Sequence, residues 1–169
     1  MKKIVDPYAH SREITETLPH GILLTTAADG KVNTMTIGWG ALGMDWNKPM
    51  FLALVRESRF SREMLDNNPE FTVNVPYGEF DKHIIGFCGS KSGRNVDKIK
   101  ELGLTLVDSD IVSVPGIKEL PLTLECKVVA RQKQEPALIC EQYRNSFYPA
   151  PEDAHIMYFG EIVNTYIIT

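Results

Sequence analysis

About six apolar, β-branched segments run along the chain, and the helical stretches between them follow no regular alternation. These segments are residues 20–27, 31–40, 49–56, 70–75, 121–131 and 155–168. A doubly wound parallel sheet needs a helix after almost every strand, whereas antiparallel strands are joined by short turns. The sequence therefore predicts a mainly β fold with short helices, in which the strands form an antiparallel barrel.

Two parts of the chain carry strong strand signals. Asp29-Gly30 supplies the positive-φ positions of a tight turn, so residues 20–27 and 31–40 are expected to form a β-hairpin. Residues 121–131 alternate between an apolar face (Leu122, Leu124, Cys126, Val128 and Ala130) and a second face (Thr123, Glu125, Lys127 and Arg131). We expect a half-buried strand there, paired with residues 155–168.

Four short helices are predicted between the strands. Ser11 is placed as the cap of a helix that Pro19 ends, and a second helix opens at Ser58 and ends before Pro69. Residues 78–87 and 94–102 are also expected to be helical, the latter ending at Gly103. Residues 137–143 are ambiguous, and residues 145–153, with two prolines and two aromatics, are expected to form an irregular loop.

Length and composition limit the function classes. A chain of 169 residues suits one domain, and a net charge of −4 argues against nucleic acid as a partner. There is no signal-peptide pattern and no run of about 20 apolar residues, so we expect a cytoplasmic protein that makes no use of a membrane. Three widely spaced cysteines without a CxxC pair argue against disulfides and zinc. The scattered histidines and the missing HExxH, GxSxG and GxGxxG patterns argue against a metal site, a hydrolase and a Rossmann fold.

The strand around residues 33–39 is the first candidate binding element. It holds polar side chains among apolar ones and includes Gly38, where a backbone without a Cβ lets a flat heteroaromatic ring come close. A plain hairpin strand with Met35 and Trp39 in the core explains the same pattern.

A small-residue loop from Cys88 leads to Lys98 and forms the second candidate. Hydroxyl groups, free backbone N–H groups and a Lys at a helix start suit a terminal phosphate, within a locally cationic stretch over residues 82–100. The GxxxxGK[ST] order is absent, so ATP and GTP are not indicated. A loop that only caps a helix is the alternative.

Three further sites carry weaker signals. Ser58 and Arg59 stand at a helix start where they could reach a phosphate or act only as a cap. Asn74 is an amide in an apolar strand, where it either bonds a ligand or braces a neighbouring loop. His155 opens the last strand, where it could touch a nicotinamide or flavin or be structural.

The order of these motifs resembles the flavin reductase-like, FMN-binding split-barrel family, close to its flavoredoxin-type members. The likeness rests on the DG hairpin, NxMTIGW, SRxS, FxVNVP, CGxxSGRxVDK, GLT, LEC, DxH and GEIV, and it spans residues 18–165. Each motif alone is weak, and their common order is specific. The chain departs from the family pattern in residues 134–153, which are longer than the short turn that normally precedes the DxH strand.

The resemblance implies a six-stranded antiparallel split β-barrel, a homodimer and non-covalently bound FMN. The isoalloxazine would be lined by Asn33, Met35, Thr36, Ile37, Gly38 and Trp39. The ribityl phosphate region would meet Ser58, Arg59 and Ser61, and the phosphate site would be completed by Ser92, Gly93 and Lys98. Asn74, Cys88 and His155 also map to pocket positions.

Two functions follow from the resemblance. In the first, NAD(P)H reduces the bound flavin, and the protein supplies position and environment while the flavin carries the redox chemistry. In the second, the protein is a non-enzymatic FMN electron carrier that serves a redox partner protein. A flavin-free β-barrel is the third alternative, and the enzyme is the one we favour.

Overall fold

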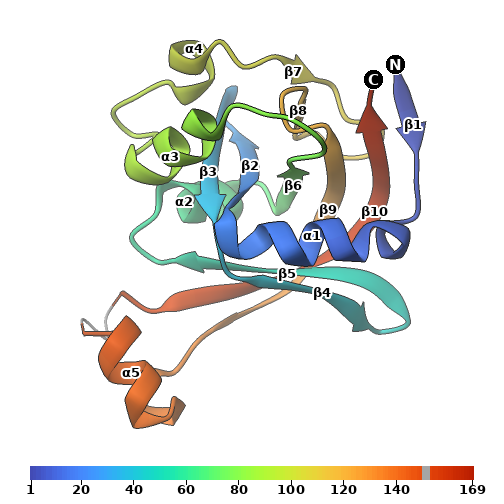
Figure 1. The fold of residues 1–169 in the computed structure, drawn as a ribbon. Helices are drawn as coiled ribbons and strands as arrows, with labels where there is room; N and C mark the ends of the chain where they lie inside the picture. Colours follow the sequence, from blue (N-terminus) through green and yellow to red (C-terminus); the bar gives the residue numbers. More distant parts are fainter. Residues whose placement is uncertain (150–152) are drawn as a thin grey trace.

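A long antiparallel sheet forms the body of the protein (Figure 1). The computed structural model describes residues 1–149 and 153–169. Its main sheet has eight strands in the order β3-β2-β6-β9-β10-β5-β4, with β1 added beside β10. The strands are β1 (Lys2–Ile4), β2 (Ile22–Ala28), β3 (Lys31–Ile37), β4 (Gly40–Asp45), β5 (Lys48–Arg56), β6 (Glu70–Val75), β9 (Leu122–Lys133) and β10 (His155–Ile168). The predicted class, a mainly β antiparallel split barrel with short helices, is confirmed. The main sheet has eight strands and not the six predicted, because β1 and β4 were not expected as separate strands.

One hydrophobic core lies inside the curved sheet. The five neighbouring strands β2, β6, β9, β10 and β5 all contribute buried side chains to the same cluster, for example Leu24, Phe71, Leu124 and Phe51. The cluster also takes Ile14 from helix α1 (Ser11–Thr17), which lies along the β4–β5 hairpin in Figure 1. Because all these strands share one interior, the sheet must curl around it as a barrel does.

Strand β10 holds the barrel together. It pairs with β9 over almost its whole length, while its other edge pairs with β5 over His155–Glu161 and with β1 over Tyr166–Ile168. The β1 pairing brings the two chain ends side by side, and the Met1 amino group donates to the Thr169 carbonyl at 2.7 Å. The predicted pairing of the last strand with β9 is thus confirmed.

Strand β3 is an edge strand of the main sheet. It pairs with β2 through the predicted hairpin, in which Asp29 and Gly30 have φ values of 50° and 74°. Its other edge faces helix α3 (Lys82–Ser90) and helix α4 (Lys98–Leu102), which belong to the segment between β6 and β9. An edge strand leaves one row of backbone groups without a neighbouring strand, so these groups can bind something else.

Several predicted boundaries were wrong. The extended segment over residues 31–40 ends at Ile37, and β4 begins at Gly40 and returns through a turn at Trp46 and Asn47, both with positive φ. Ser11 is the first residue of α1, whose N-cap is His10, and helix α2 (Phe60–Asn67) has Arg59 in place of Ser58 at its N-cap. Helix α3 starts four residues later than predicted, and helix α4 starts only at Lys98 because Asp97 caps it through the Lys100 N–H.

The predicted half-burial of β9 holds only for its second half. Glu125 is fully buried and accepts N–H groups of Asp110, Ile111 and Val112 at 2.8 to 3.1 Å. The connection that carries the small β7–β8 ladder (Leu106–Val107 with Gly116–Ile117) therefore covers the polar face of β9. Long-range covering of this kind leaves no mark in the alternation of the strand itself.

Residues 134–149 form an arm that extends from the body (Figure 1). The ambiguous stretch and the predicted irregular loop contain a 3₁₀ turn, η3 (Pro136–Leu138), and helix α5 (Glu141–Phe147). Residues 150–152, the end of the predicted loop, lie outside the described residues. The remaining short helices are η1 (Pro7–His10) and η2 (Leu18–His20), and among the described residues no helix is long and apolar enough to cross a membrane.

Candidate ligand site

Two adjoining hollows lie along the free edge of β3. The first hollow is lined by Asn33, Met35, Thr36, Ser58, Arg59, Phe60, Ser61, Cys88, Gly89, Lys91, Ser92, Gly93, Arg94 and Lys98. The second hollow is lined by Met35, Thr36, Ile37, Gly38, Trp39, Leu54, Arg56, Arg59 and His155. They share Met35, Thr36 and Arg59, so one elongated ligand can occupy both.

The ammonium group of Lys98 is buried at the base of the first hollow. The residue is only 3% exposed, and its Nζ donates to the carbonyl oxygens of Thr34 in β3 and Cys88 in α3, both at 2.9 Å. No described carboxylate lies within ion-pair distance of it, and burial lowers the pKa of Lys98. An ammonium has three N–H donors, so one remains for a ligand. A buried cation without an anion is unfavourable, and the site therefore suits an anionic group.

Asn33 joins the three segments that surround the first hollow. Its Nδ2 donates to the buried Ser61 Oγ at 3.0 Å, which ties β3 to α2. A Cβ on Gly93 would stand 2.0 Å from Asn33 Oδ1 and 2.9 Å from the ring of Phe60. The loop can therefore reach the strand only because residue 93 has no side chain.

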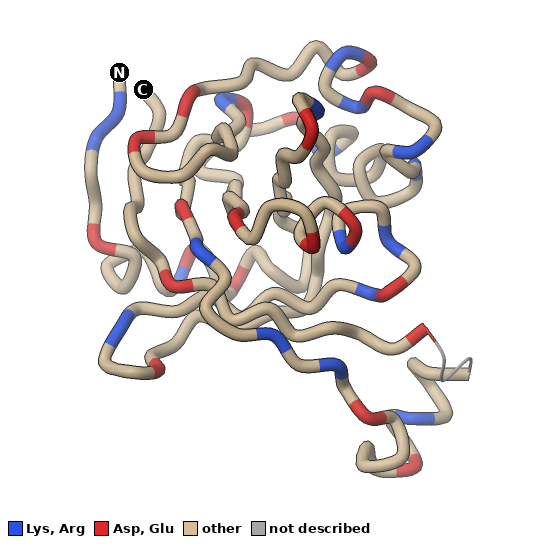
Figure 2. Tube along the Cα trace, turned by 180° about the vertical axis from the view of Figure 1, so that it is seen from behind, with Lys and Arg blue, Asp and Glu red and all other residues tan. Residues whose placement is uncertain are grey.

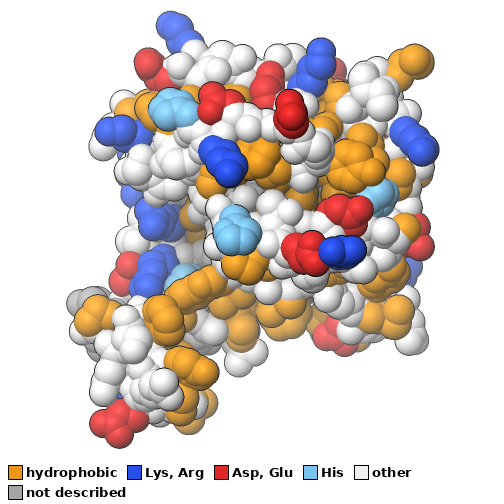
Figure 3. All heavy atoms as spheres, in the orientation of Figure 1, with side chains coloured by type: hydrophobic (Ala, Val, Ile, Leu, Met, Phe, Trp, Pro, Cys, Tyr) orange, Lys and Arg blue, Asp and Glu red, His pale blue; other side chains and the backbone are white. Residues whose placement is uncertain are grey.

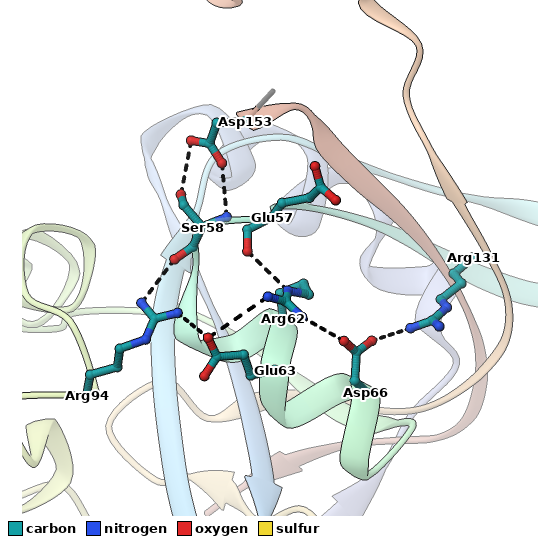
Figure 4. A network of polar contacts seen from close by, with 8 residues as sticks. All are labelled: Glu57, Ser58, Arg62, Glu63, Asp66, Arg94, Arg131 and Asp153. Carbon is teal, nitrogen blue, oxygen red and sulfur yellow. Dashed lines mark hydrogen bonds and ion pairs between the residues drawn. The ribbon is translucent and has the colours of Figure 1, made fainter. Parts of the chain in front are cut away.

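The lining of the first hollow is strongly cationic. It contains Arg59, Lys91, Arg94 and Lys98, and no Asp or Glu among the described residues. Arg94 donates to the Ser58 carbonyl at 3.0 Å and pairs with Glu63, whereas the Arg59 side chain has no partner among the described residues (Figure 4). In the whole trace, by contrast, Lys and Arg are interspersed with Asp and Glu (Figure 2). The cationic hollow is thus a local feature of an acidic protein.

Ser58 is bound to another part of the protein. Its backbone N–H and its hydroxyl donate to the two carboxylate oxygens of Asp153, at 2.9 and 3.0 Å (Figure 4). Ser58 lines the first hollow as predicted, but its hydroxyl already has an acceptor.

The second hollow is bordered by aromatic rings. The rings of Trp39 and His155 have centroids 4.9 Å apart, and Phe147 from the arm contacts Trp39 edge-on at 5.1 Å. The Tyr148 hydroxyl lies 2.8 Å from His155 Nδ1 and 2.6 Å from Gln134 Oε1. Burial, helped by the nearby Arg56, lowers the pKa of His155 to about 4, so this imidazole is neutral at neutral pH.

The strand residues of the second hollow present both side chains and backbone. Thr36 Oγ1 donates to the Ile85 carbonyl at 2.6 Å, and Ile37 points into the core. A Cβ on Gly38 would meet the Leu18 carbonyl at an ordinary 3.6 Å, so packing within the chain does not require this glycine.

Fourteen of the fifteen predicted site residues line the two hollows, and Asn74 does not. Asn74 is fully buried between neighbouring strands, where its amide accepts from Thr25 Oγ1 at 2.9 Å and donates to Thr123 Oγ1 at 3.2 Å. Both ends of the amide are satisfied within the sheet, so Asn74 has a structural role, but it braces the neighbouring strands β2 and β9 and not a loop as expected.

Several lining residues were not predicted from the sequence. They are Leu54, Arg56, Phe60, Gly89, Lys91 and Arg94. Lys91 and Arg94 stand inside the motif that was singled out, so their charge was a usable signal. Arg56 and Leu54 belong to β5, whose place beside β10 and near β3 is decided by strand pairing between distant parts of the chain.

The protein is an antiparallel split barrel with two adjoining hollows beside β3, of which the first has a cationic lining. A family model described as "Flavin reductase like domain" matches residues 15–169, and the chain therefore belongs to the flavin reductase-like family. Membership of this family supports flavin binding.

Individual relatives agree with this assignment. The flavoredoxin of Methanosarcina acetivorans has a similar structure, with a TM-score of 0.68 and 28% identity over 88% of this chain and 68% of that one. Nitrilotriacetate monooxygenase component B of Bacillus cereus, at 18% identity with a TM-score of 0.68 over 87% of this chain and 68% of that one, shares the fold.

Among curated sequences, a protein of Archaeoglobus fulgidus described as uncharacterized is 35% identical over 99 residues, which cover 59% of this chain and 55% of that one. The chain spans just over half the length of the curated relatives it matches.

Neutral His155 predicts a specific pH dependence of stability. Because the pKa of His155 is lowered to about 4 from 6.5, the unfolded chain binds a proton more readily than the native protein between these values. The contribution of His155 to stability is complete above about pH 6.5 and falls by roughly 1–3 kcal/mol as the pH drops toward 4.

The free energy of unfolding of the wild type and of His155→Gln, measured by urea denaturation at pH 7 and pH 4.5, checks this expectation. The loss on acidification should be smaller in the variant and unchanged in His20→Gln, whose ring is exposed. Equal losses in the wild type and His155→Gln would contradict it.

Proposed function

We propose that this protein is an FMN-binding oxidoreductase of the NAD(P)H:flavin reductase type. In this proposal the FMN is non-covalent, its phosphate lies in the first hollow and its isoalloxazine lies along β3 in the second hollow. The observation that carries the proposal is the buried Lys98 ammonium, which is bonded to the backbone of β3 and has no carboxylate partner among the described residues.

The donors of the first hollow fit a phosphate group. Lys98 offers a free N–H, Arg59 has no partner among the described residues, and Ser61 and Ser92 add hydroxyl groups. Charge-assisted hydrogen bonds from such groups are stronger than neutral ones, and they replace the water that a buried cation has lost.

The second hollow fits a flat ring system. Met35 and Leu54 give apolar walls, Trp39 is 40% exposed at the rim, and the unpaired edge of β3 supplies backbone donors and acceptors. These are the two requirements of a heteroaromatic ring with one polar edge.

A bound flavin supplies hydride and electron transfer, and the residues of the chain supply its position. Lys98 and Arg59 hold the anionic end, while the edge of β3 fixes the ring. Neutral His155, next to Trp39, offers a hydrogen-bonding ring without a charge at the place where a nicotinamide would approach.

A non-enzymatic FMN electron carrier is the second candidate function. The structural likeness to a flavoredoxin at 28% identity favours it, because the same site would serve a redox partner protein in place of NAD(P)H.

The remaining parts of the proposal concern the setting of the protein. Residues 1–169 would act as one flavin reductase-like domain in the cytoplasm, where the free Cys88, Cys126 and Cys140 would stay reduced. A homodimer would cover exposed apolar side chains such as Met44 and Trp46 at the β4–β5 turn, which are 68% and 60% exposed.

Replacement of Lys98 tests the phosphate site. Lys98→Ala should weaken FMN binding by about 1–3 kcal/mol, the scale for a lost hydrogen bond to a charged group, and should change riboflavin binding much less. Quenching of flavin fluorescence on titration measures both affinities, and circular dichroism checks that the variant is folded. Lys100→Ala, exposed on the same helix, is the matched control. Unchanged FMN affinity in folded Lys98→Ala protein would place the phosphate elsewhere.

Anaerobic mixing with nicotinamide donors separates the enzyme from the electron carrier. Protein loaded with FMN should lose its flavin absorbance near the visible maximum when NADH or NADPH is added, at a rate above that of free FMN. Absence of bleaching with both donors, in protein that holds FMN, would contradict the reductase and leave the carrier.

A further inference from the structure

The arm is attached to the body through a small number of contacts. Helix α5 has no buried residue, and Leu138 is 86% exposed. Figure 3 shows the arm projecting at the lower left of the molecule, with hydrophobic side chains on its surface. Arg56 donates to the carbonyl oxygens of Phe147 and Asp153, both at 2.8 Å, and Phe147 contacts Trp39. Tyr148, just after α5, is 7% exposed, and its hydroxyl lies 2.8 Å from His155 Nδ1. The arm therefore borders the second hollow, and its position depends on these few groups.

Asp153 is joined to the arm through Arg56, which donates to the carbonyl oxygens of both Asp153 and Phe147. Its carboxylate accepts the Ser58 N–H and the Ser58 hydroxyl, and it lies 4.0 Å from Arg56 Nη1. A backbone N–H together with a hydroxyl is also the donor set with which proteins bind a phosphate oxygen. Asp153 thus accepts hydrogen bonds from Ser58, which lines the first hollow. The lining of that hollow is cationic and contains no carboxylate among the described residues.

A ligand phosphate and Asp153 cannot use Ser58 together. A hydroxyl has a single hydrogen, so a phosphate that accepts it removes the bond to Asp153. Two anions at neighbouring positions also repel each other. Contact of the phosphate with Ser58 therefore competes with the contact that fixes Asp153.

We propose that Asp153 occupies an anion position at the rim of the first hollow and that the phosphate of a bound flavin nucleotide displaces it, which loosens the arm beside the second hollow. The proposal rests on the function proposed above and adds a regulation of the same site. Binding of the phosphate in the first hollow then changes access to the second hollow, through Ser58 and Asp153.

Asp153→Asn tests the competition through the sign of its effect. The amide keeps the size of the side chain and removes its charge, so FMN should bind about threefold to tenfold more tightly, the range for loss of an exposed ionic competitor. Riboflavin, which has no phosphate, should bind as it does to the wild type. Glu141→Gln removes the same charge from the exposed face of α5 and should leave both affinities unchanged.

Hydrogen exchange in the wild-type protein tests the release of the arm. Amides of residues 141–147 should exchange faster in the presence of FMN than in the presence of riboflavin at equal saturation. Faster exchange together with tighter FMN binding by Asp153→Asn supports the proposal.

Three results would overturn it. Weaker FMN binding by Asp153→Asn would mean that Asp153 holds Ser58 in place for the ligand, and an equal gain in Glu141→Gln would mean that only net charge matters. Unchanged or slower exchange of the arm on FMN binding would remove the link to the second hollow. In each case the wild type still binds FMN, whereas failure of the wild type to bind FMN would overturn the proposed function as well.

Discussion

The hydrogen bonds of Lys98 to the carbonyl oxygens of Thr34 and Cys88 join the parts of the molecule that form the site. They place a positive charge where β3, α3 and the 91–97 loop meet, in a position that is 3% exposed. Neither acceptor carries a charge, so the protein itself leaves this ammonium only partly compensated. In the proposed function, the phosphate of the flavin nucleotide supplies the missing negative charge, so the loop and the strand would act as one site.

The barrel makes this arrangement possible by leaving β3 at an edge. The long β10 strand closes the other part of the sheet through pairings with β9, β5 and β1, and the same strand delivers His155 to the second hollow. The edge of β3 faces α3 and α4, and no strand pairs with it. The segment that carries these helices can offer cationic and hydroxyl side chains to a ligand at that edge. A further β-strand would instead use the edge for backbone hydrogen bonds.

Turns and helix ends that depend on one or two residues were predicted from the sequence. Asp29-Gly30 determined the hairpin, and Gly103 ended α4 with φ of 61° as expected. The turn at Trp46 and Asn47 was missed because an aromatic residue seldom adopts positive φ, so the residue types gave little warning.

Features that depend on distant segments could not be predicted in this way. The burial of Glu125 requires the segment around Asp110, and the contact between Asp153 and Ser58 joins residues 95 positions apart. Most of the candidate site was predicted because its motifs resemble those of a known family. Asn74, in contrast, is satisfied by Thr25 and Thr123 within the sheet, a pairing that its own strand sequence does not reveal.

The most direct test of the account is to map, by amide chemical shifts, which residues FMN contacts in the intact protein. One equivalent of FMN should shift the amides of residues 33–39 and of residues 91–98 together, with a single affinity, whereas inorganic phosphate should shift only the second group. Shifts confined to one of the two segments, or two separate affinities for them, would contradict the claim that both bind one flavin nucleotide.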